Sequence, residues 1–498
     1  MKNRHFVALF ILFCYTVTGL IIYDDYGISW DEPMQRSYGE VVINYVVEGD
    51  TALYSHNSRY HGPAFQMLLY SIEKLTASEL GTYKIRHLGT FLFSVFGLWC
   101  FYHLLLLLHF KPHWSALGIL FLIASPRVFA HSFYNSKDAV LMYMFIVCVY
   151  ALVTFIQKPK ISSAVILGLL AGILIDIRIL GLFLPMFLIA VWGLRTVESL
   201  DYGKRTFHLV LLSGLITVVV MIVFWPTLWR NPVIEFGNAL AKMGDYPWDD
   251  PVLFAGSFAL PKDLPWYYLP KWMFISTPLV LSGFAVVGVF GLGLKKETSI
   301  WEKAIPFIWL LPLLIIVAKG ATVYDGWRHV FFLYPAIVIL AVSGAEMTFG
   351  RWRSMPFLKW VPAALMLIPL SYIIRSHPHQ QVYFNATVSK NAWRNYEMDY
   401  WGLSYKQGLE YVCALEPKGR LKLSVANGPG FYNHYQLGKT DQERIDWVSR
   451  DSADFFISNF RFPKAFEAFA NNSGAYHTPL KIIEVDGNPI LGVFDLRN

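Results

Sequence analysis

The chain has 498 residues, of which 55% are hydrophobic and only 15% are charged. A soluble globular protein has about 25% charged residues, so this composition excludes an ordinary soluble protein, and the long apolar runs predict a membrane protein. The formal net charge of +7 does not indicate nucleic acid binding, because much of the lysine and arginine lies in short loops between apolar runs. The four cysteines have no metal-like spacing and predict no disulfide framework.

The first apolar run, 6–22, follows a basic start at residues 1–5. Cleaved signal peptides share this pattern, but the run is near spanning length and no Ala-x-Ala cleavage signal follows it. We therefore predict a retained first helix.

Ten further apolar runs follow, and each has about the length that a helix needs to cross the hydrocarbon core, roughly 20 residues. The eleven predicted transmembrane helices lie near 6–22, 88–108, 115–131, 139–156, 162–176, 179–194, 207–225, 269–293, 304–319, 329–347 and 358–374. The two short runs, 162–176 and 179–194, predict a helical hairpin that is only just long enough to cross the membrane.

Loop charges predict the orientation, because cytoplasmic loops carry an excess of lysine and arginine. With the N-terminus in the cytoplasm, the inner loops carry Lys2, Arg4, Lys111, Lys158, Lys160, Arg195, Lys204, Arg205, Lys295, Lys296, Lys303, Arg351, Arg353 and Lys359. The outer segments then carry the carboxylates Asp24, Asp25, Asp31, Glu32, Asp138, Asp245, Asp249 and Asp250. An odd number of spans in the inner (plasma) membrane places the tail after Arg375 on the periplasmic or extracellular side.

Two outer loops, 23–87 and 226–268, are long and rich in aromatic residues, proline and glycine. Loops of this length are usually functional, although an interfacial belt of Trp and Tyr also explains the aromatic residues. Segment 38–48 predicts a helix on the membrane surface.

The polar tail, 375–498, has the size of a domain. It predicts an amphipathic helix at 404–415, strands at 421–426 and 454–458, and a hairpin of 480–485 and 490–496. The predicted fold is thus an all-α polytopic membrane domain, 1–374, followed by an extracytoplasmic α/β domain, 375–498.

The sharpest chemical feature is the adjacent pair Asp31 and Glu32, directly after the first span. Such carboxylates can act as a general base or bind a metal, and desolvation near apolar surface raises the pKa of a carboxylate toward useful basicity. The alternative is an ordinary hydrated acidic loop.

A third carboxylate, Asp138, opens the fourth span on the same predicted side. Asn135 can cap this helix, and an acidic residue at a helix N-terminus is favourable by itself. Three carboxylates on one face could alternatively orient an acceptor or, through Asp31 and Asp138, hold Mg²⁺ or Mn²⁺.

Basic residues on the outer side run against the topology bias and therefore need another partner. They are Arg59, His61, Lys84, Arg86, Arg127, Arg328 and His329. An anionic phosphate is the natural partner, and lipid headgroups are the alternative. Asp176 and Arg178 predict only a local ion pair at a hairpin tip.

These motifs resemble the GT-C glycosyltransferases over about residues 1–350. The resemblance rests on the Asp31–Glu32 pair, on His61-Gly62-Pro63, on Lys84-Ile85-Arg86 before the second span, and on Ser125-Pro126 with Asp138. The most similar group is glycosyltransferase family 39, which includes protein O-mannosyltransferases and aminoarabinose transferases.

The resemblance implies transfer of a sugar from a polyprenyl phosphate. It implies that Asp31 is the base that acts on the acceptor hydroxyl and that Glu32 is its neighbour in the mannosyltransferase pattern. Asp138 matches the acid of the second outer loop, and Lys84 and Arg86 fall where the family binds the lipid phosphate. Gly62 stands where members often have proline, and no β-trefoil insertion is present, and both departures argue against a protein acceptor. A glycan or a lipid is the other candidate acceptor.

Chemistry alone leads to the same prediction, because a lipid-phosphate donor needs membrane helices, cations and a carboxylate base. A one-step displacement of this kind inverts the anomeric centre. A transporter is the main alternative and requires paired charges at mid-membrane, whereas the apolar runs here are almost free of charge. A non-catalytic envelope scaffold would not need a polar first loop of this length.

Overall fold

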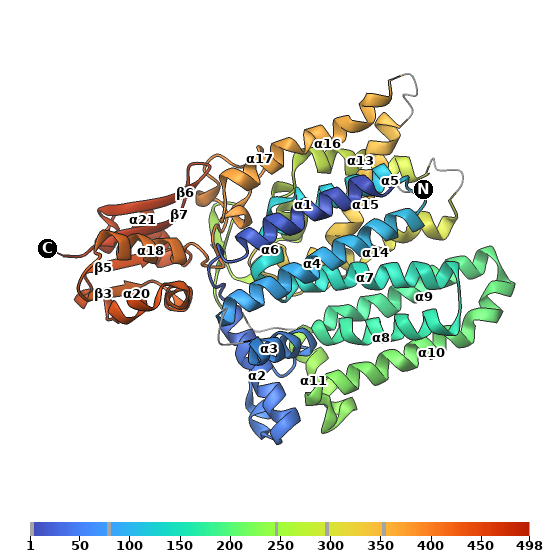
Figure 1. Ribbon diagram of the computed structural model, residues 1–498, viewed down its shortest axis with the longest axis horizontal. Helices are drawn as coiled ribbons and strands as arrows, with labels where there is room; N and C mark the ends of the chain where they lie inside the picture. Colours follow the sequence, from blue (N-terminus) through green and yellow to red (C-terminus); the bar gives the residue numbers. More distant parts are fainter. Residues whose placement is uncertain (1–3, 77–80, 245–247, 294–297, 351–354, 498) are drawn as a thin grey trace.

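A computed structural model describes residues 4–76, 81–244, 248–293, 298–350 and 355–497. It shows a bundle of apolar helices with a small α/β domain at one end, and the N-terminal helix begins at the opposite end (Figure 1). Of the charges used for the topology prediction, Lys2, Asp245, Lys295, Lys296, Arg351 and Arg353 lie outside the described residues.

All eleven predicted spans are helical over most of their length. The bundle helices are α1 (Phe6–Ile22), α4 (Thr82–Leu107), α5 (Pro112–Ile123), α6 (Pro126–Tyr134), α7 (Asp138–Gln157), α8 (Ile161–Ile177), α9 (Phe183–Glu198), α10 (Leu200–Phe224), α12 (Tyr268–Ile275), α13 (Leu279–Gly293), α14 (Ile300–Ala318), α15 (Tyr334–Phe349), α16 (Val361–Leu365) and α17 (Leu367–Arg375). The most buried of the long ones are α7 and α15, which form the centre of the bundle.

Not every predicted span is a single long helix. Within the described residues, seven helical stretches are long and apolar enough to cross a membrane, or up to nine if each of two bent pairs is one span. Helices α1 and α8, with 17 residues each, are apolar but shorter. The predicted eleven is therefore reached only if both bent pairs and both short helices also cross.

Prolines explain the two bent pairs. Helices α5 and α6 meet at 71° where Ser125, directly before Pro126, adopts an extended conformation. The residue before a proline disfavours the helical conformation, and proline itself donates no backbone hydrogen bond. Helices α12 and α13 meet at 117°, with Pro278 in the break. The spans predicted at 115–131 and 269–293 are therefore each divided into two helices.

The long loops fold against the end of the bundle that carries the α/β domain (Figure 1). Loop 23–87 contains α2 (Glu32–Glu48) and α3 (Ala64–Thr76), and loop 226–268 contains α11 (Pro232–Gly244) and the hairpin of β1 (Val252–Phe254) and β2 (Ser257–Ala259). The predicted helix at 38–48 is thus the second half of α2. The 3₁₀ helices are η1 (Thr51–Ser55), η2 (Ile179–Leu182), η3 (Pro226–Trp229), η4 (Pro261–Asp263), η5 (Arg328–Leu333), η6 (Pro356–Trp360), η7 (Gln380–Val382), η8 (Ala392–Arg394), η9 (Asn433–Gln436), η10 (Arg450–Ser452) and η11 (Gly474–Tyr476).

The C-terminal region folds around a five-stranded sheet of order β4-β3-β5-β7-β6. The strands are β3 (Leu421–Val425), β4 (Ile445–Trp447), β5 (Phe455–Ser458), β6 (Pro479–Val485) and β7 (Asn488–Asp495), and the helices are α18 (Tyr405–Leu415), α19 (Gly428–Tyr432), α20 (Lys439–Arg444) and α21 (Pro463–Ala470). Strand β3 is parallel to β4 and β5, and β7 is antiparallel to β5 and β6. Asp486 and Gly487 both have positive φ, as the tight turn of the predicted hairpin requires.

One buried amide joins the C-terminal domain to the first loop. Asn433 Nδ2 donates to the carbonyl of Ile28 at 3.0 Å, and Asn433 Oδ1 accepts from the amide of Ile28 at 2.8 Å. Gly27 lies so close to the backbone of Leu403 that a side chain there would overlap it. Segment 27–31, which ends in the predicted base, is therefore held by the C-terminal domain.

Candidate functional site

Two of the three predicted carboxylates meet at one arginine. Asp31 is the residue before α2, Asp138 is the first residue of α7, and Arg328 opens η5. The Arg328 guanidinium lies 2.8 Å from Asp31 Oδ2 and 3.7 Å from Asp138 Oδ2. The Asp138 side chain is buried, whereas 23% of the Asp31 side chain is exposed. Asp31 is therefore the carboxylate that a substrate can reach.

Asp138 also forms an ion pair with Arg178. Asn135 caps the helix, because its Oδ1 accepts from the amides of Lys137 at 3.2 Å and Asp138 at 2.8 Å. The predicted pair of Asp176 with Arg178 is wrong, since the Arg178 side chain reaches across to α7. Within the described chain no hydrogen bond reaches the buried carboxylate of Asp176.

Glu32 points away from Asp31. Its carboxylate lies 2.9 Å from His87 Nε2 and also accepts from the amide of Ser29 at 2.7 Å. Both Glu32 and His87 are buried. This geometry gives Glu32 a role in fixing the start of α2 against α4.

The C-terminal domain contributes a charge to the same site. Arg461 lies 2.7 Å from Asp325 Oδ1, and Asp325 Oδ2 lies 3.2 Å from Arg328. The guanidinium of Arg461 stands 4.9 Å from the centre of the Trp30 ring, and that of Arg328 stands 4.5 Å from the centre of the Trp401 ring. A chain of alternating charges thus runs from the C-terminal domain to Asp31.

The charges around Asp31 set its protonation state. Burial by itself raises the pKa of Asp31, but the positive charges of Arg328 and Lys137 outweigh it and hold the pKa below its usual value. Burial raises the pKa of Asp325, and the positive charges of Arg461 and Arg328 offset part of this rise. Asp31 is therefore ionised at neutral pH.

Further basic residues surround the carboxylates. Burial and the charge of Arg178 lower the pKa of Lys137 to about 7. Burial, then the charges of Lys137 and Arg178, lower the pKa of His61 well below its usual value. His329 is in contact with the ring of Tyr324, with centroids 4.7 Å apart. Of the seven predicted cations, His61, Arg328 and His329 thus lie around the carboxylates.

Gly62 explains how His61 reaches this place. The backbone of Gly62 packs directly on the carbonyl of Asp176, at the end of α8, and a side chain at this position would overlap it. The loop therefore lies against the turn that carries Arg178. A glycine at this position thus has a local steric reason.

The other four predicted cations have partners elsewhere. Lys84 forms an ion pair with Asp24, Arg59 donates to the carbonyl of Tyr54, and Arg86 donates to Gln66. Arg127 donates to the carbonyl of Tyr383 at 3.0 Å and lies over the rings of Trp272 and Phe384. The structure does not bring these four to the Asp31 carboxylate.

The sequence interpretation missed several residues of the site. They are Lys137, Arg178, Asp325, Glu397 and Arg461. Glu397 is buried close to Asp325, and burial together with that negative charge raises its pKa to about 8. Lys137 directly precedes Asp138 and Asp325 lies three residues before Arg328, so both carried a local signal. Arg461 carried none.

The fit of a divalent cation to Asp31 and Asp138 is poor in this arrangement. Each carboxylate already has a guanidinium partner. Among the described residues, no group of three or more His, Cys, Asp or Glu side chains has a metal-binding arrangement. A cation between them would have to displace Arg328.

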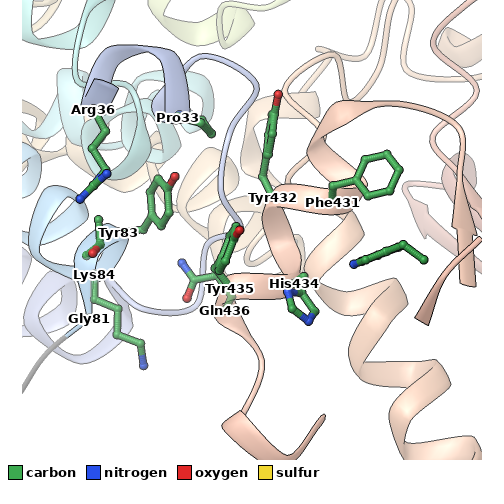
Figure 2. A pocket seen from close by; sticks show the side chains of 12 residues that line it. Pro33, Arg36, Gly81, Tyr83, Lys84, Phe431, Tyr432, His434, Tyr435 and Gln436 are labelled. Atoms are coloured by element: carbon green, nitrogen blue, oxygen red, sulfur yellow. The ribbon is translucent and has the colours of Figure 1, made fainter. Parts of the chain in front are cut away.

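Two cavities are lined by residues that are close in sequence to the site. An apolar cavity of about 320 Å³ lies between α8, α9 and α10, and Ile175, close to Arg178, is among its lining residues. An open cleft of about 930 Å³ lies between the starts of α2 and α4 and the C-terminal domain (Figure 2). Pro33, close to Asp31, lines this cleft.

One solved structure matches the whole architecture. It is the crystal structure of ArnT from Cupriavidus metallidurans bound to undecaprenyl phosphate, with a TM-score of 0.51 and 13% sequence identity over 96% of this chain and 97% of that one. This chain has the fold of ArnT. The fold is therefore a GT-C-like polytopic membrane fold, as the sequence predicts. A second structure, the arabinofuranosyltransferase AftD from Mycobacteria, gives a TM-score of 0.45 and 12% identity over 98% of this chain and 41% of that chain.

No family model and no curated protein matches the sequence. The likeness to ArnT thus concerns the fold, and the chemistry has to be argued from the residues of this chain.

Proposed function

We propose that this protein is an integral membrane glycosyltransferase that moves a sugar from a polyprenyl-phosphate donor to a hydroxyl acceptor on the extracytoplasmic side. The observation that carries the proposal is Asp31, an ionised and partly exposed carboxylate among cations at the end of a membrane bundle. The bound undecaprenyl phosphate of ArnT, which shares the fold, supports the choice of donor.

The proposed step is a single displacement. Asp31 takes the proton of the acceptor hydroxyl, whose oxygen forms a bond to the anomeric carbon of the sugar. The bond between that carbon and the phosphate oxygen breaks, and its electron pair stays on the polyprenyl phosphate. Lys137, Arg178 and Arg328 offset the negative charge of this leaving group. The configuration of the anomeric centre is inverted.

The apolar cavity gives the donor's tail a place. It is lined mainly by apolar side chains of α8, α9 and α10, including Leu167, Leu188 and Met221. Its end near Ile175 lies close to Arg178, so that a prenyl chain in the cavity would present its phosphate to the cations. This role for the cavity is part of the proposal.

The test is a transfer assay on the purified protein. Polyprenyl-phosphate sugars with a radiolabelled sugar are incubated with the protein, and loss of label from the lipid is followed. Asp31→Asn keeps the shape of the side chain and removes the base, so turnover should fall by about 10²–10⁴-fold while donor binding persists.

Asp201→Asn is the matched control. Asp201 lies in an exposed ion pair with Arg205 at the opposite end of the bundle. Its substitution should therefore leave turnover unchanged. Full turnover in Asp31→Asn would exclude Asp31 as the base. The absence of transfer from every polyprenyl-phosphate sugar tested would remove the proposed activity.

A further inference from the structure

The open cleft that Pro33 lines is built from two parts of the chain. One wall consists of Pro33 and Arg36 of α2 and of residues 81–84 at the start of α4, and the other comes from α19, η9 and β4 of the C-terminal domain (Figure 2). Its volume of about 930 Å³ is at the upper end of the range for small-molecule sites, about 300–1,000 Å³.

Aromatic rings form a continuous strip on the C-terminal wall. Phe431 and Trp447 have ring centroids 4.8 Å apart, Trp447 and His434 5.8 Å, and His434 and Tyr435 5.6 Å. Phe431 is 44% exposed and Tyr435 is 64% exposed. Tyr83 stands on the opposite wall (Figure 2). Aromatic faces carry partial negative charge and pack well against C–H groups.

Polar groups accompany the rings. Gln436 lines the cleft, and its buried Nε2 donates no hydrogen bond within the described residues. The hydroxyl groups of Tyr83, Tyr432 and Tyr435 belong to lining residues as well. A ligand for this cleft therefore has C–H faces and hydroxyl edges on the same ring, which is the chemistry of a sugar.

The charges of the cleft point to a neutral ligand. Arg36 lies 2.6 Å from Glu73, and Lys84 is paired with Asp24. Both cations are thus already neutralised. A phosphate or an anionic lipid headgroup would have to break these pairs.

We infer that this cleft binds a carbohydrate and that this carbohydrate is the acceptor, an inference that rests on the proposed function. The N-terminal end of α2 links cleft and base, because Pro33 lines the cleft two residues after Asp31. A saccharide on the aromatic strip can extend along this turn and place a terminal hydroxyl at Asp31. The C-terminal domain thereby supplies half of the acceptor site.

Binding is tested without catalysis. The full-length protein in detergent is applied to an array of defined oligosaccharides, and in parallel to a peptide array and to phosphatidylglycerol vesicles. We expect oligosaccharide binding that Tyr435→Ala weakens by roughly tenfold, as for a ring at the centre of an interface. Since Tyr435 is exposed, its removal should leave the fold intact. Trp266→Ala, which removes a 73% exposed ring outside the cleft, is the matched control.

The kinetic readout separates this inference from the proposed function. With an oligosaccharide that binds, Tyr435→Ala should raise the KM for the acceptor and leave donor binding unchanged. If transfer depends on Asp31 but Tyr435→Ala leaves the acceptor KM unchanged, the cleft is not the acceptor site, while the proposed transferase activity stands. If oligosaccharides bind in a Tyr435-dependent way but no transfer is detected, both the proposed transferase activity and the acceptor role of the cleft are excluded. An array without a binder, or Tyr435-dependent binding of peptides or vesicles instead, would overturn the inference.

Discussion

Asp31 and Glu32 are adjacent in the sequence but have different surroundings. The first turn of α2 directs Asp31 toward Arg328 and the solvent, and Glu32 toward the buried His87. Paired carboxylates in a sequence therefore do not imply shared chemistry. One of them is placed for proton transfer and the other for holding the helix in position.

This division predicts opposite effects for two conservative substitutions. Glu32→Gln removes a buried charge opposite His87, which should lower the free energy of unfolding by about 1–3 kcal/mol. Turnover of the folded protein should change far less than in Asp31→Asn. Thermal unfolding and the transfer assay measure the two quantities. A drop in turnover as large as that of Asp31→Asn, at unchanged stability, would instead place Glu32 in the chemistry.

Lys137 predicts a pH dependence of donor binding. Its pKa of about 7 means that the free protein loses this positive charge as the pH rises through neutrality. Because a phosphate prefers the charged form, donor affinity should fall above about pH 7, by up to roughly 10–150-fold. Binding of undecaprenyl phosphate across the pH range is the measurement.

The matched variant is Lys137→Arg, which stays protonated and should abolish this fall. Lys204→Arg changes an exposed residue near the start of α10 and should leave the profile unchanged. If the affinity of the wild-type protein for undecaprenyl phosphate does not fall above neutral pH, Lys137 does not bind the phosphate.

At the scale of elements, the segment between β5 and α21 belongs to the site. It brings Arg461 to Asp325, which in turn holds Arg328. Arg461 touches neither Asp31 nor Asp138 in the structure, so it is a positioning residue. Its effect on Asp31 should pass through Arg328.

Arg461→Gln tests this coupling. Without Arg461, Asp325 draws Arg328 away from Asp31, whose pKa should then rise. The acid limb of the kcat/KM profile should therefore move to higher pH, and Arg461→Lys should restore part of the shift. Arg497→Gln, which removes an exposed ion-paired arginine of the same domain, is the control. If Arg461→Gln lowers thermal stability but leaves the acid limb of the pH profile of kcat/KM unchanged, Arg461 has only a structural role.

Elements with a local signal could be predicted from the sequence. The apolar runs, α18 and the hairpin of β6 and β7 follow from composition and turn residues. The bends at Ser125-Pro126 and near Pro278 were missed, because hydropathy does not distinguish a straight span from a broken one. Strand β4 has only three residues and gave no pattern.

The same limit applies to the site. Asp31, Asp138 and Arg328 stood out, because all three lie beside apolar runs on the predicted outer side. Arg178 appeared to be part of a local pair, and only the packing of α8 against α7 sends its side chain to Asp138. Arg461 lies more than a hundred residues from its partner Asp325, and no sequence pattern records such a pairing.

At the scale of the whole molecule, the two cavities lie in different surroundings. The apolar cavity lies within the helices of the bundle, and the aromatic cleft lies under the C-terminal domain. In the proposed reaction, the donor arrives through the membrane and the acceptor from the aqueous side. The two substrates then meet only at the short segment before α2, which both the bundle and the C-terminal domain hold in place.

This arrangement requires that the C-terminal domain and the acidic loops share one side of the membrane, opposite the basic loops. Single cysteines at the exposed positions Asp249 and Lys418 should react with a membrane-impermeant maleimide in intact cells. Cysteines at Lys160 and Lys204 should react only after permeabilisation, because basic short loops remain in the cytoplasm. Exposed Cys14 is first replaced by serine, while Cys100, Cys148 and Cys413 are buried and should stay silent. Labelling of Lys418→Cys and Lys204→Cys from the same side would exclude an odd number of crossings between them and the proposed orientation with it.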